Sequence, residues 1–106
     1  MIPSLAAMLA LLWASPVTTE MVEVPDRGAV DLAPFACTDT PRSTLVRRVC
    51  YDDARLKLVV NAEGIYSEYC GLPASTFEAF VIAPSMGQFF RQHIAAGGTK
   101  FSCRAD

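Results

Sequence analysis

Four cysteines, Cys37, Cys50, Cys70 and Cys103, constrain the folding of this 106-residue chain more than any other feature. Neighbouring cysteines are separated by 12, 19 and 32 residues, with no C-x-x-C pair. Zinc sites usually take their ligands in closely spaced pairs, so this even number at wide spacing favours two disulfides. A disulfide that closes a loop of about 15 residues adds about 3 kcal/mol, which matters in a chain long enough for one small domain. No cofactor and no metal are expected.

The N-terminal segment predicts export. No charged residue precedes Glu20, and Leu5–Trp13 is an uninterrupted apolar run followed by small and turn-forming residues. A helix of that length spans about 14 Å, against about 30 Å for the hydrocarbon core of a bilayer. Residues 1–19 are therefore predicted to be a signal peptide, cleaved between Ala14 and Glu20, with a buried N-terminal helix as the alternative. The mature chain is expected to be periplasmic or secreted, as disulfides favour, and without a transmembrane segment.

Charge is divided along the chain. The net charge is −2, but residues 20–40 carry −4 and residues 41–60 carry +3. Blocks of this size usually form solvated faces, and the domain lacks the strongly basic balance that is typical of nucleic-acid-binding domains.

Three strands are expected in the middle of the chain. Residues 20–43 contain three prolines and little periodicity, and are expected to form an N-terminal arm without regular structure. Residues 45–51, 56–60 and 65–70 are rich in β-branched and aromatic side chains, and turn-forming residues separate them at 52–55 and 61–64. The sequence therefore predicts an antiparallel meander.

Two short helices are expected to follow. Ser75 with Glu78 forms a capping box before a helix that ends at Pro84, and Ser85 with Gln88 repeats the box. The second helix carries one apolar stripe, made of Met86, Phe89, Phe90, His93 and Ile94. The expected fold class is α+β: a three-stranded antiparallel meander followed by two short helices packed on one face, with disulfide-stapled N- and C-terminal extensions.

Strand register limits the disulfide pairing. If Tyr51 opposes Leu56 and Asn61 opposes Gly64, Cys50 and Cys70 share one face but lie on the first and third strands. Two strand spacings are about 9.6 Å, beyond the limit of about 7 Å between the Cα atoms of a disulfide. Two connectivities remain, Cys37–Cys50 with Cys70–Cys103, or Cys37–Cys70 with Cys50–Cys103. The first is favoured because its loop from Cys37 is shorter.

This register divides the side chains of the meander between two faces. One is apolar and holds Val49, Tyr51, Leu56, Leu58, Val60, Ile65 and Tyr69. The other is mixed and holds Val46, Arg48, Cys50, Lys57, Val59, Tyr66, Glu68 and Cys70. Basic and aromatic groups on an open sheet can pair with and stack on a ligand. The candidate binding face comprises Arg47, Arg48, Lys57, Tyr66, Glu68 and Tyr69; the alternative is a solvated face with Lys57 and Glu68 paired.

No catalytic constellation is expected. His93 is the sole histidine and falls on an apolar helix stripe, where packing is the simpler explanation. Helix capping accounts for Ser85, and four oxidised cysteines leave no thiolate nucleophile.

Three local patterns stand out between about Leu45 and Ile94. Val49, Tyr51 and Asp52 end the first expected strand, and Leu72-Pro73 follows the third. An A-x-S-x-G-x-x-F-x-x-x-I pattern is formed by Ala83, Ser85, Gly87, Phe90 and Ile94. In these patterns the sequence resembles the KTSC domain, a bacterial module found alone and at the C-terminus of some lysyl-tRNA synthetases. The family's Tyr-x-Tyr falls at Ser67-Glu68-Tyr69, so its first tyrosine is replaced. The resemblance implies a KTSC-like domain over residues 44–106 and an association with RNA enzymes, but no reaction.

These observations predict an exported, non-catalytic binding module whose partner is a periplasmic protein or a component of the cell envelope. The alternative is RNA binding through the basic and aromatic sheet face, which export makes less accessible.

Overall fold

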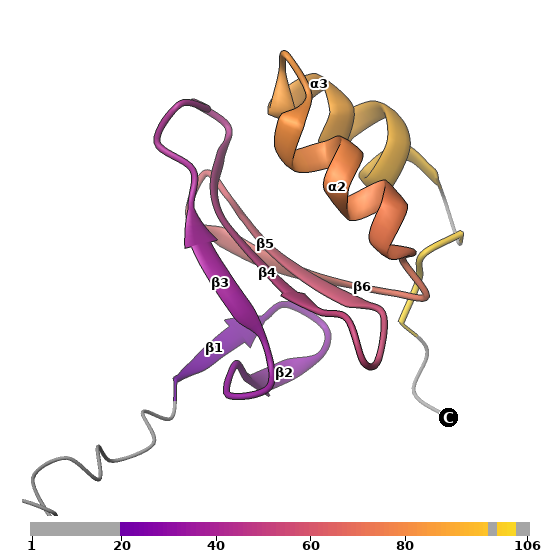
Figure 1. Ribbon diagram of the computed structural model, residues 1–106. Coiled ribbons are helices and arrows are strands. Elements are labelled where there is room, and N and C mark those ends of the chain that lie inside the picture. The colour runs from indigo at the N-terminus through magenta and orange to yellow at the C-terminus, as the bar shows by residue number, and fades with distance from the viewer. Residues whose placement is uncertain (1–19, 98–99, 104–106) are drawn as a thin grey trace, which may run out of the picture.

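The computed structural model describes residues 20–97 and 100–103, and the predicted signal peptide, residues 1–19, lies outside this part of the chain. Six strands and the helical segments make an α+β fold (Figure 1). The strands are β1 Met21–Val24, β2 Gly28–Asp31, β3 Ala36–Asp39, β4 Val46–Asp52, β5 Lys57–Ala62 and β6 Ile65–Cys70. The helices are α2 Ala74–Ile82 and α3 Met86–Phe89, which continues as a π-helical turn over Phe90–Ile94 and a 3-10 turn over Ala95–Gly97.

The segment expected to be an irregular arm, residues 20–43, is instead the N-terminal half of the β structure. β1 and β2 form an antiparallel hairpin, and β3 pairs with β4 at the edge of a four-stranded sheet of order β3-β4-β5-β6. In β1, the buried Val22 and Val24 alternate with the exposed Glu23. This two-residue period is typical of a half-buried strand. Here it covers only the four residues of β1 before Pro25, too few to stand out in the sequence. The predicted three-stranded meander is therefore β4–β6 within a larger sheet.

The strand registers differ from the predicted ones by two residues. Tyr51 opposes Leu58 and Asn61 opposes Tyr66. A shift of two keeps every side chain on its face, so the two faces were mostly right. Leu56, expected in the apolar face, lies in the turn with a positive φ of 55° and is exposed. Ile65, at the far turn, is also exposed.

One β-bulge reverses a predicted side-chain direction. The register shifts between Val46 and Arg48, which puts Val46 on the helix side of the sheet, where it is fully buried. The prediction that Val46 shares a face with Arg48 is wrong, because an extra residue in the bulge breaks the simple alternation.

The sheet separates two cores, as Figure 1 shows with the helices on one side and the β1–β2 hairpin on the other. The helix-side core contains Val46, Val49, Tyr51, Leu58, Val60, Leu72, Phe80, Met86, Phe90, Ile94 and Phe101. The hairpin-side core contains Val22, Val24, Leu32, Phe35, Cys50 and Val59. The face expected to be open and mixed is therefore largely covered.

The helix boundaries agree with the prediction only in part. α2 begins at Ala74 after Pro73, with no side-chain cap, so the Ser75–Glu78 capping box is wrong. The second cap is confirmed, because the backbone N–H of Gln88 donates to Ser85 Oγ at 3.2 Å. His93 is exposed rather than packed in the stripe. The π-helical turn has more residues per turn than the α-helix that was assumed, which moves His93 away from the core while Phe90 and Ile94 stay buried.

The favoured disulfide pairing is confirmed. Cys37–Cys50 joins directly opposed residues of β3 and β4, with Cα atoms 3.9 Å apart. Cys70–Cys103 ties the C-terminal segment to the end of β6, where the N–H of Cys70 also donates to the carbonyl of Phe101 at 2.8 Å. Among the described residues, no helix is long and apolar enough to cross a membrane.

Candidate binding site

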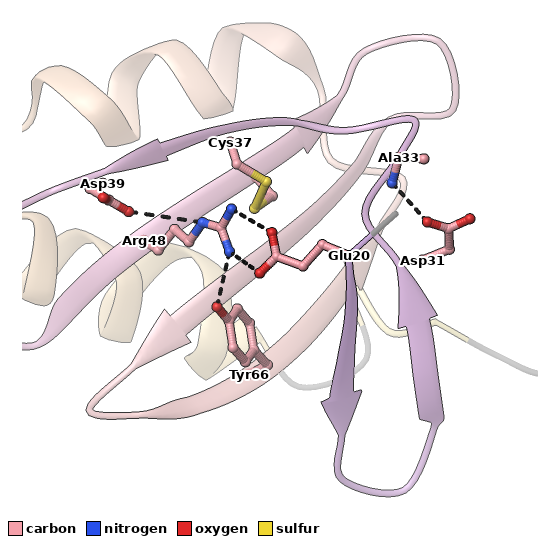
Figure 2. The surroundings of a disulfide bond; sticks show 8 residues. Glu20, Asp31, Ala33, Cys37, Asp39, Arg48 and Tyr66 are labelled. Atoms are coloured by element: carbon pink, nitrogen blue, oxygen red, sulfur yellow. Dashed lines mark hydrogen bonds and ion pairs between the residues drawn. A yellow bond between two sulfur atoms is a disulfide. The ribbon is translucent and has the colours of Figure 1, made fainter. Parts of the chain in front are cut away.

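The residues of the predicted binding face are divided among different surroundings. Arg48 is held by Glu20, with N–O distances of 2.6 and 2.8 Å, and by the Tyr66 hydroxyl at 3.3 Å (Figure 2). The hydrogen bond from Arg48 lowers the pKa of the Glu20 carboxyl, and the same pairing raises the pKa of Arg48. This cation is therefore engaged within the molecule.

Glu68 is engaged in the same way. Its side chain is 4% exposed and accepts from Arg27 Nε at 3.0 Å, while Lys57 Nζ lies 4.0 Å from its second oxygen. Arg27 also donates to the carbonyl of Cys103 at 2.9 Å. The alternative to a binding face is a solvated face in which Lys57 pairs with Glu68. Arg27 of the hairpin adds a second and closer cation to Glu68.

The last two predicted residues lie apart from these groups. Tyr69 packs on the helix side, edge-on to Phe90 with ring centroids 5.8 Å apart. Arg47 is exposed at the β-bulge. The structure thus does not bring the six residues together as one open surface.

The Tyr-Asp pair at the end of β4 has a structural role. Tyr51 donates from its hydroxyl to the carbonyl of Leu72 at 2.7 Å and stacks on Phe77 with centroids 4.4 Å apart. Asp52 is buried and accepts from the backbone N–H groups of Ala54 and Arg55 and from the Arg55 side chain. The Arg55 hydrogen bond lowers the pKa of the Asp52 carboxyl. These contacts fix the β4–β5 turn and join the sheet to α2.

The A-x-S-x-G segment also has structural roles. Ser85 caps α3. A Cβ atom on Gly87 would lie 3.3 Å from the Cβ of Leu45, so glycine allows α3 to approach the start of β4 closely. Arg42 donates through Nη2 to the carbonyls of Val81 and Ala83, at 2.8 and 2.9 Å, which satisfies the end of α2.

A groove that the sequence did not predict lies between β3 and α2. It has a volume of about 490 Å³ and separates β3 and the following loop from α2. Its lining residues are Thr38, Asp39, Thr40, Pro41, Arg42, Val49, Phe77, Val81 and Met86. We call this the β3–α2 groove. No sequence signal located it, because β3 itself was assigned to the irregular arm.

A second hollow, of about 390 Å³, lies on the other side of Arg42 against the start of α3. Its walls carry Arg42, Arg91 and Glu63 beside the Ser85 cap, so it is more polar than the β3–α2 groove. Both hollows share Arg42, whose guanidinium is held in place by the end of α2.

The described residues offer little to a catalyst or a metal. His93 contacts Phe89, with ring centroids 4.7 Å apart, and lines a shallow pocket with Lys100. In residues 20–97 and 100–103, the one group with metal-ligand spacing is Glu68, Cys70 and Cys103, and its two sulfur atoms are joined in a disulfide. A disulfide cannot supply the thiolates that a metal would need.

Comparison with known proteins identifies a solved structure and a family that resemble this chain. A KTSC domain protein from Yersinia pestis has a similar crystal structure, with a TM-score of 0.58 and 26% sequence identity, over 68% of this chain and 97% of that one. No curated protein matches the sequence. The KTSC domain family model matches residues 42–97, from the loop before β4 to the end of the helical segment and over half of the chain. The chain therefore belongs to the KTSC domain family.

Proposed function

We propose that this protein is an exported, non-catalytic binding module that holds a protein or another component of the cell envelope in the β3–α2 groove. The observation that carries the proposal is the groove itself, an apolar-walled hollow beside the edge strand of the sheet. Binding sites are concave and mostly apolar, with a few polar groups that orient the ligand. Phe77, Val81 and Met86 supply the apolar wall, and Arg42 and Asp39 supply the polar groups.

Export is supported by two features of different kinds. Both disulfides are integral to the fold, because Cys50 is fully buried and the Cys70–Cys103 bond ties the C-terminal segment to β6. Disulfides of this kind persist in oxidising compartments. The apolar run in residues 1–19 supplies the signal peptide of the proposal, and residues 44–106 its KTSC-like domain.

RNA binding is the weaker alternative. It needs free cations and exposed aromatic rings on the sheet, whereas Arg48 is bonded to Glu20 and Tyr66, and Lys57 lies against Glu68. Releasing them to phosphates would break the Arg48–Glu20 ion pair and leave the nearly buried Glu68 with Arg27 alone.

Site-specific photocrosslinking in the periplasm tests the proposal. A photoreactive side chain at Thr38, which lines the groove, is expected to give a discrete adduct. The same group at Ile65, which is exposed at the β5–β6 turn, serves as the control and is expected to give none. Val81→Ala should weaken the adduct from Thr38, whereas Ile82→Ala, at an exposed neighbour on α2, should leave it unchanged. An adduct that forms equally from Ile65, or one digested by ribonuclease, would contradict the proposal.

A further inference from the structure

The open edge of β3 presents backbone groups to solvent. The N–H of Thr40 donates to the carbonyl of Arg47 at 2.9 Å, so Thr40 and, by alternation, Thr38 direct their backbone toward β4. Cys37 and Asp39 then direct their N–H and C=O groups away from the sheet. The close approach of Cys37 to Cys50, 3.9 Å between Cα atoms, agrees with a pair that is not hydrogen-bonded. Within residues 20–97 and 100–103, no other backbone group bonds to this edge.

The opposite edge of the sheet, formed by β6, is partly covered by the C-terminal segment. At the end of β6, Phe101 accepts the hydrogen bond of the Cys70 N–H, and the neighbouring disulfide fixes that contact. β3 is only four residues long, and Pro34 and Pro41 stand on either side of it. Short strands and flanking prolines limit indiscriminate edge pairing. Such an edge suits a short extended segment of about 13 Å better than a long strand.

The β3–α2 groove lies on the helix side of the same edge. Thr38 and Thr40 face it from the strand, and Phe77 and Val81 face it from α2. A peptide residue opposite Thr38 would point its side chain into the groove, and its two neighbours would point to the hairpin side. An added strand would therefore present one side chain to the groove at every second position.

Charges at the two ends of the groove differ in sign. Arg42 lies at the Thr40 end. At the other end Ala36 opposes Tyr51, whose pKa is raised by burial and also by the carboxylates of Asp53, Asp52 and Glu78. Asp52 is paired with Arg55, so Asp53 and Glu78 carry the negative charge of this end. A segment that runs antiparallel to β3 would meet Arg42 at its N-terminal end and these carboxylates at its C-terminal end.

We propose that β3 binds an extended peptide segment of a partner protein as an added antiparallel strand, with an acidic side chain opposite Thr40 at Arg42, an aliphatic side chain opposite Thr38 in the β3–α2 groove, and a basic side chain opposite Ala36 at the Tyr51 end. This assignment rests on the proposed function, since it names the ligand class of the same groove. Strand addition of this kind obtains affinity from the main chain and selectivity from alternate side chains.

A capped pentapeptide, Asp-Thr-Val-Thr-Lys, provides the probe, because its aspartate, valine and lysine would oppose Thr40, Thr38 and Ala36 and so face the groove. Its two threonines would oppose Asp39 and Cys37, so their N–H groups face β3, whereas the N–H group of the valine faces solvent. N-methylation of both threonines should weaken binding by on the order of tenfold, because two hydrogen bonds are lost. N-methylation of the central valine is the matched control and should leave the affinity nearly unchanged. Isothermal titration with the disulfide-bonded protein measures all three affinities.

Amide hydrogen exchange supplies a second measurement. The peptide should slow exchange at Cys37 and Asp39, and leave exchange at Ile65 unchanged. Equal effects of the two methylation patterns, unchanged exchange at Cys37 and Asp39, or no binding at millimolar peptide would overturn strand addition. So would a dimer of the protein alone whose β3 amides are already protected, which would assign the edge to a second copy. The groove crosslink from Thr38 does not depend on these outcomes, so the failure of strand addition is distinguishable from the failure of the binding module.

Discussion

Tyr51 and Asp52, two residues of the family pattern, form hydrogen bonds with backbone groups. Asp52 accepts three hydrogen bonds in the β4–β5 turn, and the hydroxyl of Tyr51 bonds the carbonyl of Leu72 just before α2. Both side chains are buried. They therefore hold the turn and the sheet-to-helix connection.

Asp52 has a testable dependence on pH. Its native pKa lies below the ordinary value, so its contribution to stability is present above the unfolded pKa and is lost as pH falls through the native one. Asp52→Asn keeps an acceptor for the turn but loses the charge, and should cost about 1 kcal/mol at pH 7. Urea unfolding at neutral and acidic pH should show this cost shrinking below about pH 4. Asp53→Asn, at the exposed neighbour, is the control and should shift stability little. A cost that stays constant with pH would contradict the assigned contacts.

At the scale of elements, the β1–β2 hairpin is the main addition to the helix-and-meander arrangement. It covers the sheet face opposite the helices and closes a second core around Cys50 and Val59. Arg27 of the hairpin turn reaches Glu68 of β6 and the carbonyl of Cys103, and Glu20 reaches Arg48 of β4. The hairpin is thus an integral layer of the fold.

Val24 tests this role of the hairpin. It is 3% exposed, so Val24→Ala should lower the free energy of unfolding by about 2 kcal/mol through the lost burial and the cavity left behind. Glu23→Ala, in the same strand but exposed, should change stability by less than about 0.5 kcal/mol. Equilibrium urea unfolding of both variants makes the comparison. Equal, small effects would show that the hairpin is dispensable, as an arm would be.

At the scale of the whole molecule, one disulfide lies at each edge of the four-stranded sheet. Cys37–Cys50 joins the edge strand to the centre, and Cys70–Cys103 returns the C-terminal segment so that Phe101 enters the helix-side core. A small chain builds a limited core, and crosslinks supply stability that burial alone does not. This construction is consistent with the proposed export, because it depends on oxidation.

Intact mass spectrometry of the protein recovered from a periplasmic fraction tests that proposal. The mass should correspond to cleavage between Ala14 and Glu20, with two hydrogens lost for each of the two disulfides. Reduction should restore those hydrogens, which provides the internal control. A full-length mass with four free thiols would contradict export.

Local patterns in the sequence determined much of this fold. Strands β4 to β6, the end of α2 before Pro84, the Ser85 cap and the exclusion of a Cys50–Cys70 bond all follow from alternation, turn residues and the distance between strands. These properties are decided by neighbours along the chain or by the repeat of a strand, and a sequence displays both. The family resemblance rested on the same residues, and the family model matches them.

Only the tertiary structure decided what covers the second face of the sheet. Residues 20–43 have too little local signal, and their strands are held by the pairing of β1 with β2 and of β3 with β4 and by packing on Cys50 and Val59 in the hairpin-side core. The bulge at Val46 and the π-helical turn at His93 each change the direction of one side chain. Tertiary packing selects these local irregularities, and the residue pattern alone does not reveal them. The β3–α2 groove follows from the same cause: it lies between segments about 40 residues apart, and a sequence does not encode such a surface at any one place.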